Sequence, residues 1–238
     1  MKRLFSALFV FCIFVVPARS DYLSGRATAM ELFNAGKFQE AADGFLRLEE
    51  AAKNDVQQAD ALTNAALALQ RMKRPDEAMA VAEKIRSAPL ATFCRISLLR
   101  DSRQWEALLK LTEGEDFSVW PGKVIYPAYM ARAQAQASLG HAAAAESDAF
   151  RAQESTISPN QKAMAWEFIA ERSRIANEPP QKTLDAYEKI IGLNPTGAVL
   201  RRALYKRALL LTDLKQWDQA RADISQLENL QKDEPHWN

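Results

Sequence analysis

Apolar residues recur along the chain with a period of three to four positions rather than two. The segments at residues 59–72 (ADALTNAALALQRM) and 202–214 (RALYKRALLLTDL) separate Ala and Leu from polar residues in this way, which is typical of amphipathic helices. No segment sustains an alternation of apolar and polar residues, and Val, Ile and Thr are sparse beside Ala and Leu. The pattern predicts an all-α protein with essentially no sheet.

A short motif recurs six times between these helical segments. Its sixth residue is Ala in four copies and Leu or Thr in the other two. That residue falls at positions 41, 78, 108, 145, 183 and 220, so the successive steps are 37, 30, 37, 38 and 37 residues by subtraction. A period in this range indicates stacked supersecondary units. The copies begin at Gly36, Lys73, Arg103, Gly140, Glu178 and Lys215.

Each unit is interpreted as two antiparallel helices joined at the start of the motif. Gly36 and Gly140 suit such a turn because the residue after a helix end often needs a positive φ. Small residues at the sixth position let two helices approach closely, and Pro75 fits the first turn of a second helix. The aromatic residues at repeat positions are expected in the core: Phe38, Phe45, Trp105, Tyr187 and Trp217.

These residues resemble the tetratricopeptide-repeat family over roughly residues 25–230. The resemblance is carried by Leu32, Gly36, Phe38, Ala41 and Phe45 in the first unit, by Tyr187, Ile190, Leu193 and Pro195 in the fifth, and by Leu204, Ala208, Leu211, Trp217, Ala220 and Ile224 in the sixth. It implies a right-handed superhelical stack, an α-solenoid, of about six helix-turn-helix units. Arg132 and Gln136 depart from the pattern because they occupy usually apolar positions, and the longer period implies an extra helical turn per unit.

The units are expected near residues 25–55, 59–88, 91–112, 126–155, 160–195 and 198–230, within a repeat domain at 21–230 and before a tail at 231–238. The short third step and the segment at 114–127 predict a bend or a loop insertion there. Trp120 and Trp237 have no repeat position to fill. Each is expected either to cover an exposed end of the stack or to anchor a partner.

The first twenty residues have the features of a secretory signal. Lys2 and Arg3 precede an apolar run that is too short to span a bilayer as a helix, and Ala18-Arg19-Ser20 fits a cleavage site. We expect cleavage after Ser20, a periplasmic or secreted protein and no integral membrane segment in the mature chain. An uncleaved anchor is the alternative.

Charge and cysteine content narrow the possible partners. Loss of the three basic residues in the signal leaves 28 of the 31 Lys and Arg against 30 Asp and Glu, so no basic surplus favours nucleic acid. Cys94 would be the single thiol after cleavage, and its apolar neighbours indicate a small buried hydrophobe.

The chain offers little material for catalysis. His141 and His236 are its two histidines, and it contains no CxxC pair, HExxH motif or phosphate-binding loop. We therefore expect no catalytic residues, no metal site and no cofactor. A helical hydrolase that uses a carboxylate pair is the alternative enzyme hypothesis.

First helices of such units line a concave groove, where relatives commonly bind an extended peptide or a partner helix. The groove candidates here are Asn64, Arg71, Arg100, Gln134, Arg172, Arg202, Tyr205 and Lys206. Because cations outnumber acids among them, they predict an acidic or carboxylate-bearing partner segment. The sequence thus predicts a non-enzymatic protein-interaction module or adaptor. The alternative is a component of an outer-membrane assembly or secretion machinery, docked through its partner.

Overall fold

The computed structural model describes residues 22–232 and contains only helices in that range. Its elements are α1 (Tyr22–Asn34), α2 (Phe38–Ala51), α3 (Asp55–Arg71), α4 (Pro75–Ala82), α5 (Ala88–Asp101), α6 (Trp105–Leu111), the 3-10 helix η1 (Phe117–Val119), α7 (Gly122–Ser138), α8 (Ala142–Glu154), α9 (Pro159–Ile175), α10 (Pro180–Gly192), α11 (Gly197–Asp213) and α12 (Trp217–Lys232). The proposed signal at residues 1–20 and Trp237 lie outside the described residues.

The twelve α-helices form six hairpins, each with a positive-φ residue in its turn. This residue is Gly36, Lys73, Arg103, Gly140, Asn177 or Lys215. Five of the six coincide with the first residue of the sequence motif. In the fifth hairpin the positive φ falls on Asn177, one residue before the expected Glu178. Asn tolerates this conformation better than most residues, and Pro180 then opens α10.

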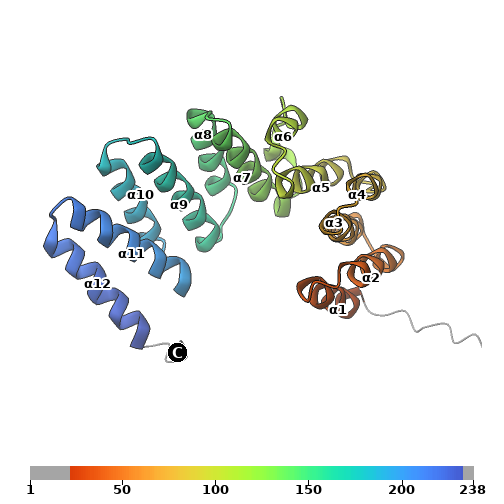
Figure 1. Cartoon of the computed structure of the whole chain (residues 1–238), viewed down its shortest axis with the longest axis horizontal. Coiled ribbons are helices and arrows are strands. Elements are labelled where there is room, and N and C mark those ends of the chain that lie inside the picture. The colour runs from red at the N-terminus through yellow and green to blue at the C-terminus, as the bar shows by residue number, and fades with distance from the viewer. Residues whose placement is uncertain (1–21, 233–238) are drawn as a thin grey trace, which may run out of the picture.

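The hairpins stack in chain order into one curved array, which Figure 1 shows as an arc. The second helix of each hairpin packs against the first helix of the next, from α2 against α3 to α10 against α11. The odd-numbered helices lie on the inner side of the arc and the even-numbered helices on its outer side (Figure 1). The expected all-α stack of about six tetratricopeptide-like units is therefore confirmed.

Helix lengths account for the uneven period. The first helices α3, α7, α9 and α11 each have 17 residues, whereas the second helices α4 and α6 have only 8 and 7. The short step from Ala78 to Leu108 crosses α4 and the 14-residue α5. The outer helices are consequently shortest in the second and third units.

The segment between α6 and α7 holds a short helix and an aromatic cluster. Phe117 of η1 is fully buried, and its ring packs edge-on against Trp120 and Tyr129, with ring centroids 4.7 and 5.0 Å away. Trp120 is only 7% exposed. It is therefore a core residue, and the expectation that it covers an end of the stack or anchors a partner is wrong. Helix α7 begins at Gly122 and includes Pro127.

The other aromatic residues at repeat positions mostly follow the prediction. Phe45 and Tyr187 are buried, and Phe38 and Trp105 are half-buried. Trp217 is 52% exposed, so its assignment to the core is wrong. Trp217 opens the last helix of the stack, and no further unit follows that could cover it within residues 22–232.

Cys94 confirms its prediction as a buried small hydrophobe. Its side chain on α5 is fully buried, and burial raises the pKa of its thiol to about 11. A thiol with this pKa is a poor nucleophile at neutral pH.

A buried ion pair explains the unusual Arg132 of the fourth unit. Its guanidinium donates from Nε and Nη2 to the carboxylate of Asp148, at 2.7 and 2.8 Å. Nη1 also donates to the carbonyls of Thr112 and Glu115, at 3.2 and 3.0 Å, and the charge lies 4.4 Å from the ring centroid of Phe117. Arg132 thus joins α7 to α8 and to the segment that follows α6.

The apolar core is divided unevenly along the array. One large cluster extends from Tyr22 to Ala152 and unites the first four units. Three small clusters, each with three to six buried residues, hold the remainder together.

None of the helices within residues 22–232 combines the length and the apolar character that a membrane span requires.

Candidate interaction surface

The inner surface of the arc is built from the odd-numbered helices. These first helices also contact one another directly, as in α3 with α5, α5 with α7 and α9 with α11. Side chains that bridge two first helices therefore mark this surface. Residues three, four or seven positions away from such a bridge lie on the same helix face.

An ion-pair cluster joins α9 to α11 on this surface. Arg202 donates from Nε and Nη2 to the two carboxylate oxygens of Glu167, at 2.6 and 2.7 Å, and Lys206 donates to Glu167 at 3.1 Å. Partial burial tends to raise the pKa of Glu167. The hydrogen bonds from Arg202 and Lys206 outweigh this effect and lower that pKa below its ordinary value.

Two similar bridges cross the N-terminal units. Arg26 on α1 donates to Asp60 on α3 at 2.6 and 3.1 Å, and the hydroxyl of Tyr22 donates to the same carboxylate at 3.1 Å. Arg71 on α3 donates to Asp101 on α5 at 2.5 Å. These polar side chains connect one unit to the next.

The eight residues predicted from the sequence all lie on first helices, but several are already bonded. Arg71, Arg202 and Lys206 are ion-paired, and Asn64 donates to the backbone carbonyl of Asp60 at 2.8 Å. Tyr205, Arg100 and Gln134 are exposed, and Arg172 is half-buried. Their role in binding stays a prediction. The acidic partners Asp60, Asp101 and Glu167 were missed, although each lies about one repeat length from its cation.

Apolar side chains are exposed on the same surface in the last two units. Met164 precedes Glu167 by three positions, and Tyr205 and Leu209 follow Arg202 by three and seven. All three side chains are about half exposed. The inner surface there combines apolar area with two cations that share one carboxylate.

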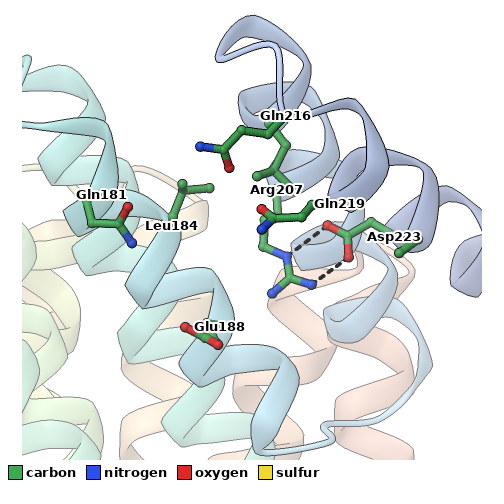
Figure 2. Close-up of a pocket in the computed structure, with 9 residues that line it drawn as sticks. Gln181, Leu184, Glu188, Arg207, Gln216, Gln219 and Asp223 are labelled. Atoms are coloured by element: carbon green, nitrogen blue, oxygen red, sulfur yellow. Dashed lines mark hydrogen bonds and ion pairs between the residues drawn. The ribbon is translucent and has the colours of Figure 1, made fainter.

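A pocket of about 420 Å³ opens on the outer side, between α10, α11 and α12. Figure 2 shows Gln181, Leu184 and Glu188 on one side of it, opposite Gln216, Gln219 and Asp223. Arg207 donates to both carboxylate oxygens of Asp223, at 2.8 and 2.6 Å. Because Arg207 engages both oxygens, Asp223 does not form with Glu188 the free carboxylate pair that the hydrolase alternative requires.

Metal-ligating side chains do not gather elsewhere in the described part of the chain. No group of three or more His, Cys, Asp or Glu residues within positions 22–232 could hold a metal ion. His141 lies exposed in the fourth hairpin turn.

Similar solved structures support the fold. The crystal structure of PilW, described as a widely conserved type IV pilus biogenesis factor, aligns with a TM-score of 0.60 at 16% identity over 92% of this chain and 96% of that one. BtubC (BKLC) from P. vanneervenii aligns with a TM-score of 0.58 at 12% identity over 91% and 93%. The chain therefore has a tetratricopeptide-like repeat fold. No protein-family model and no curated protein matches the sequence.

Glu167 gives a testable pH dependence. We expect Glu167→Gln to reduce the free energy of unfolding by up to about 1 kcal/mol at neutral pH, since Arg202 is nearly half exposed and water screens the pair. The lowered pKa means that the carboxylate stabilises the fold above its unfolded pKa of about 4.3. This stabilisation is lost as the pH falls through the folded value.

Urea unfolding at a series of pH values measures this effect. The difference between the variant and wild type should close in acid, and a constant difference would contradict the assignment. Glu83, which is exposed and forms no ion pair among the described residues, provides a control as Glu83→Gln, with no change expected.

Proposed function

We propose that this protein is an exported, non-enzymatic adaptor that binds a peptide segment or a partner helix on the inner surface of its arc. The observation that supports this most directly is the exposed apolar area of Met164, Tyr205 and Leu209 beside the cations of α11. Packing of the array covers only about half of each of these apolar side chains. Exposed apolar side chains that are surrounded by polar residues are typical of protein-interaction sites.

Export and location in the periplasm or secreted space form part of the same proposal. They rest on the basic residues, apolar run and small residues of positions 1–20. N-terminal sequencing of the protein recovered from cells tests the cleavage, and an N-terminus at Asp21 is expected. Retention of Met1 would contradict it.

The nature of the partner follows from the composition of this surface. Arg202 and Lys206 share the single carboxylate of Glu167, which leaves a surplus positive charge beside the apolar side chains. A partner segment that combines apolar anchors with an acidic residue or a terminal carboxylate would complement it.

Crosslinking in intact cells, followed by mass spectrometry, tests this binding. A photoreactive residue at position 205 should capture a partner, and one at the exposed outer position Gln226 should not. The double variant Met164→Ala, Tyr205→Ala is expected to weaken capture at least about tenfold, since truncation of buried interface anchors often costs more than about 1 kcal/mol. The same yield from both positions would contradict the proposal.

Two further variants test the specificity of this binding and its charge preference. Val119→Ala removes an aliphatic side chain that is exposed in the segment before α7, and it should leave capture unchanged. Arg172→Glu tests the charge preference because Arg172 has no ion pair among the described residues. If Arg172→Glu does not weaken capture, the acidic character of the partner is wrong while the apolar site can stand.

A second candidate is a component of an outer-membrane assembly or secretion machinery, docked through its partner. PilW, a type IV pilus biogenesis factor, has the same fold over nearly the same length, which is the reason to test it. Recovery in the membrane fraction with release by salt would favour this candidate. Recovery in the soluble exported fraction would favour a free adaptor.

A further inference from the structure

One repeat position is buried in every unit except the last. This position lies nine residues after the positive-φ residue of each hairpin turn, and it is occupied by Phe45, Ala82, Thr112, Ala149, Ala186 and Ile224. The first five side chains are at most 2% exposed, whereas Ile224 is 46% exposed. In the earlier units this face meets the first helix of the next unit, so Ile224 belongs to an interface that the described chain leaves open.

The open face is one continuous stripe along α12. Trp217, Arg221, Ile224 and Glu228 follow one another at spacings of four, three and four residues, the spacing of a helix-pairing seam. All four are exposed, with Trp217 at 52%. The equivalent residues Thr183, Ala186 and Ile190 of α10 are buried, and Ala186 and Ile190 pack with Ala203 of α11.

The charges on this stripe indicate which helix fits it. Arg221 lies three positions before Ile224 and Glu228 four positions after it, and neither has an ion-pair partner among the described residues. An antiparallel copy of α12 centred near Ile224 would place Arg221 of each chain beside Glu228 of the other. The stripe is thus complementary to itself, as a two-fold interface requires.

The opposite end of the stack offers a different surface. Helix α1 exposes one large apolar side chain, Leu23, at 69%, and its other exposed residues include the small or polar Ala27, Thr28 and Glu31. Stacking α1 of one chain on α12 of another would not bring Arg221 beside Glu228. Only the two-fold pair therefore predicts that reversing both charges restores association.

We propose that the protein dimerises through antiparallel pairing of its two α12 helices, with the two Ile224 side chains nearest the two-fold axis, an Arg221–Glu228 pair on either side of them and Trp217 farther out along the same seam. The dimer joins two arcs at their C-terminal ends and leaves both inner surfaces open. It is independent of the partner proposed for the inner surface.

Sedimentation equilibrium of the purified full-length protein over a wide concentration range tests the proposal. Wild type should form a dimer. Arg221→Glu should raise the dimer dissociation constant roughly tenfold or more, because it places two acidic residues side by side. The double variant Arg221→Glu, Glu228→Arg should restore association because the pairs form again with reversed charges.

Ile224→Glu should sediment as a monomer, with circular dichroism confirming that it remains helical. Val119→Glu, at an exposed aliphatic residue far along the chain, should associate like wild type. A wild-type monomer at every concentration would overturn the proposal. So would a dimer that tolerates both Arg221→Glu and Ile224→Glu, or a double variant that fails to regain association.

Discussion

Replacement of Asp148 by Ala is expected to lower the free energy of unfolding by about 3–5 kcal/mol, because it leaves the guanidinium of Arg132 buried without a counter-charge. The two side chains are only 12% and 5% exposed, so water replaces little of the lost interaction. Arg132 also holds the backbone between α6 and α7 through its bonds to Thr112 and Glu115. Urea unfolding followed by circular dichroism measures the effect.

Two variants make this result interpretable. Asp185→Ala removes an exposed aspartate at a comparable position along α10, the second helix of the fifth hairpin. This variant should cost about 0.5 kcal/mol or less. The double variant Arg132→Met, Asp148→Leu should be more stable than Asp148→Ala, since it removes both charges together. If the double variant is as unstable as Asp148→Ala, the loss does not arise from an unpaired charge.

Replacement of Phe117 by Ala is expected to cost about 3–5 kcal/mol, as for other large aromatic side chains in cores. Phe117 is fully buried and contacts Trp120, Tyr129 and the guanidinium of Arg132. Its loss leaves a cavity beside the connection between α6 and α7, which is the longest connection between hairpins in the described part of the chain. Denaturant unfolding again gives the measurement.

The smaller substitution Phe117→Leu keeps most of the apolar volume and should cost clearly less than Phe117→Ala. Because Arg132 contacts both Phe117 and Asp148, the costs of Phe117→Ala and Asp148→Ala should not add. Additive costs would show that the ring and the carboxylate act on the fold separately. Equal costs for Phe117→Leu and Phe117→Ala would contradict the cavity argument.

The sequence predicted the hairpins well because the physical causes are local. A helical period recurs within every unit, the crossing residue is Ala in four of the six units, and each hairpin turn places one residue at positive φ. Even Asn177 fits this pattern, although it precedes the expected turn residue by one position. In the sequence alone, Arg132 resembles a degenerate repeat position. The structure explains this charged residue by the position of Asp148 in the neighbouring helix, to which Arg132 donates.

The exposed surfaces were harder to predict from a single chain. Trp217 shares its repeat position with the half-buried Phe38 and Trp105, yet it is 52% exposed in the last described helix. The predicted groove cations Arg71, Arg202 and Lys206 face acids from a neighbouring unit. Such bridges depend on how far one unit is rotated against the next, which repeat spacing does not specify.

The uneven division of the core gives the molecule a gradient of rigidity. In a repeat array each unit is held by its own packing and by its neighbours, so the four units that share one large cluster should open together and rarely. The last two units depend on small separate clusters and have the lower cost of local opening. The apolar residues Met164, Tyr205 and Leu209 belong to this softer third of the molecule, which can adjust its curvature while the stiff remainder holds its shape.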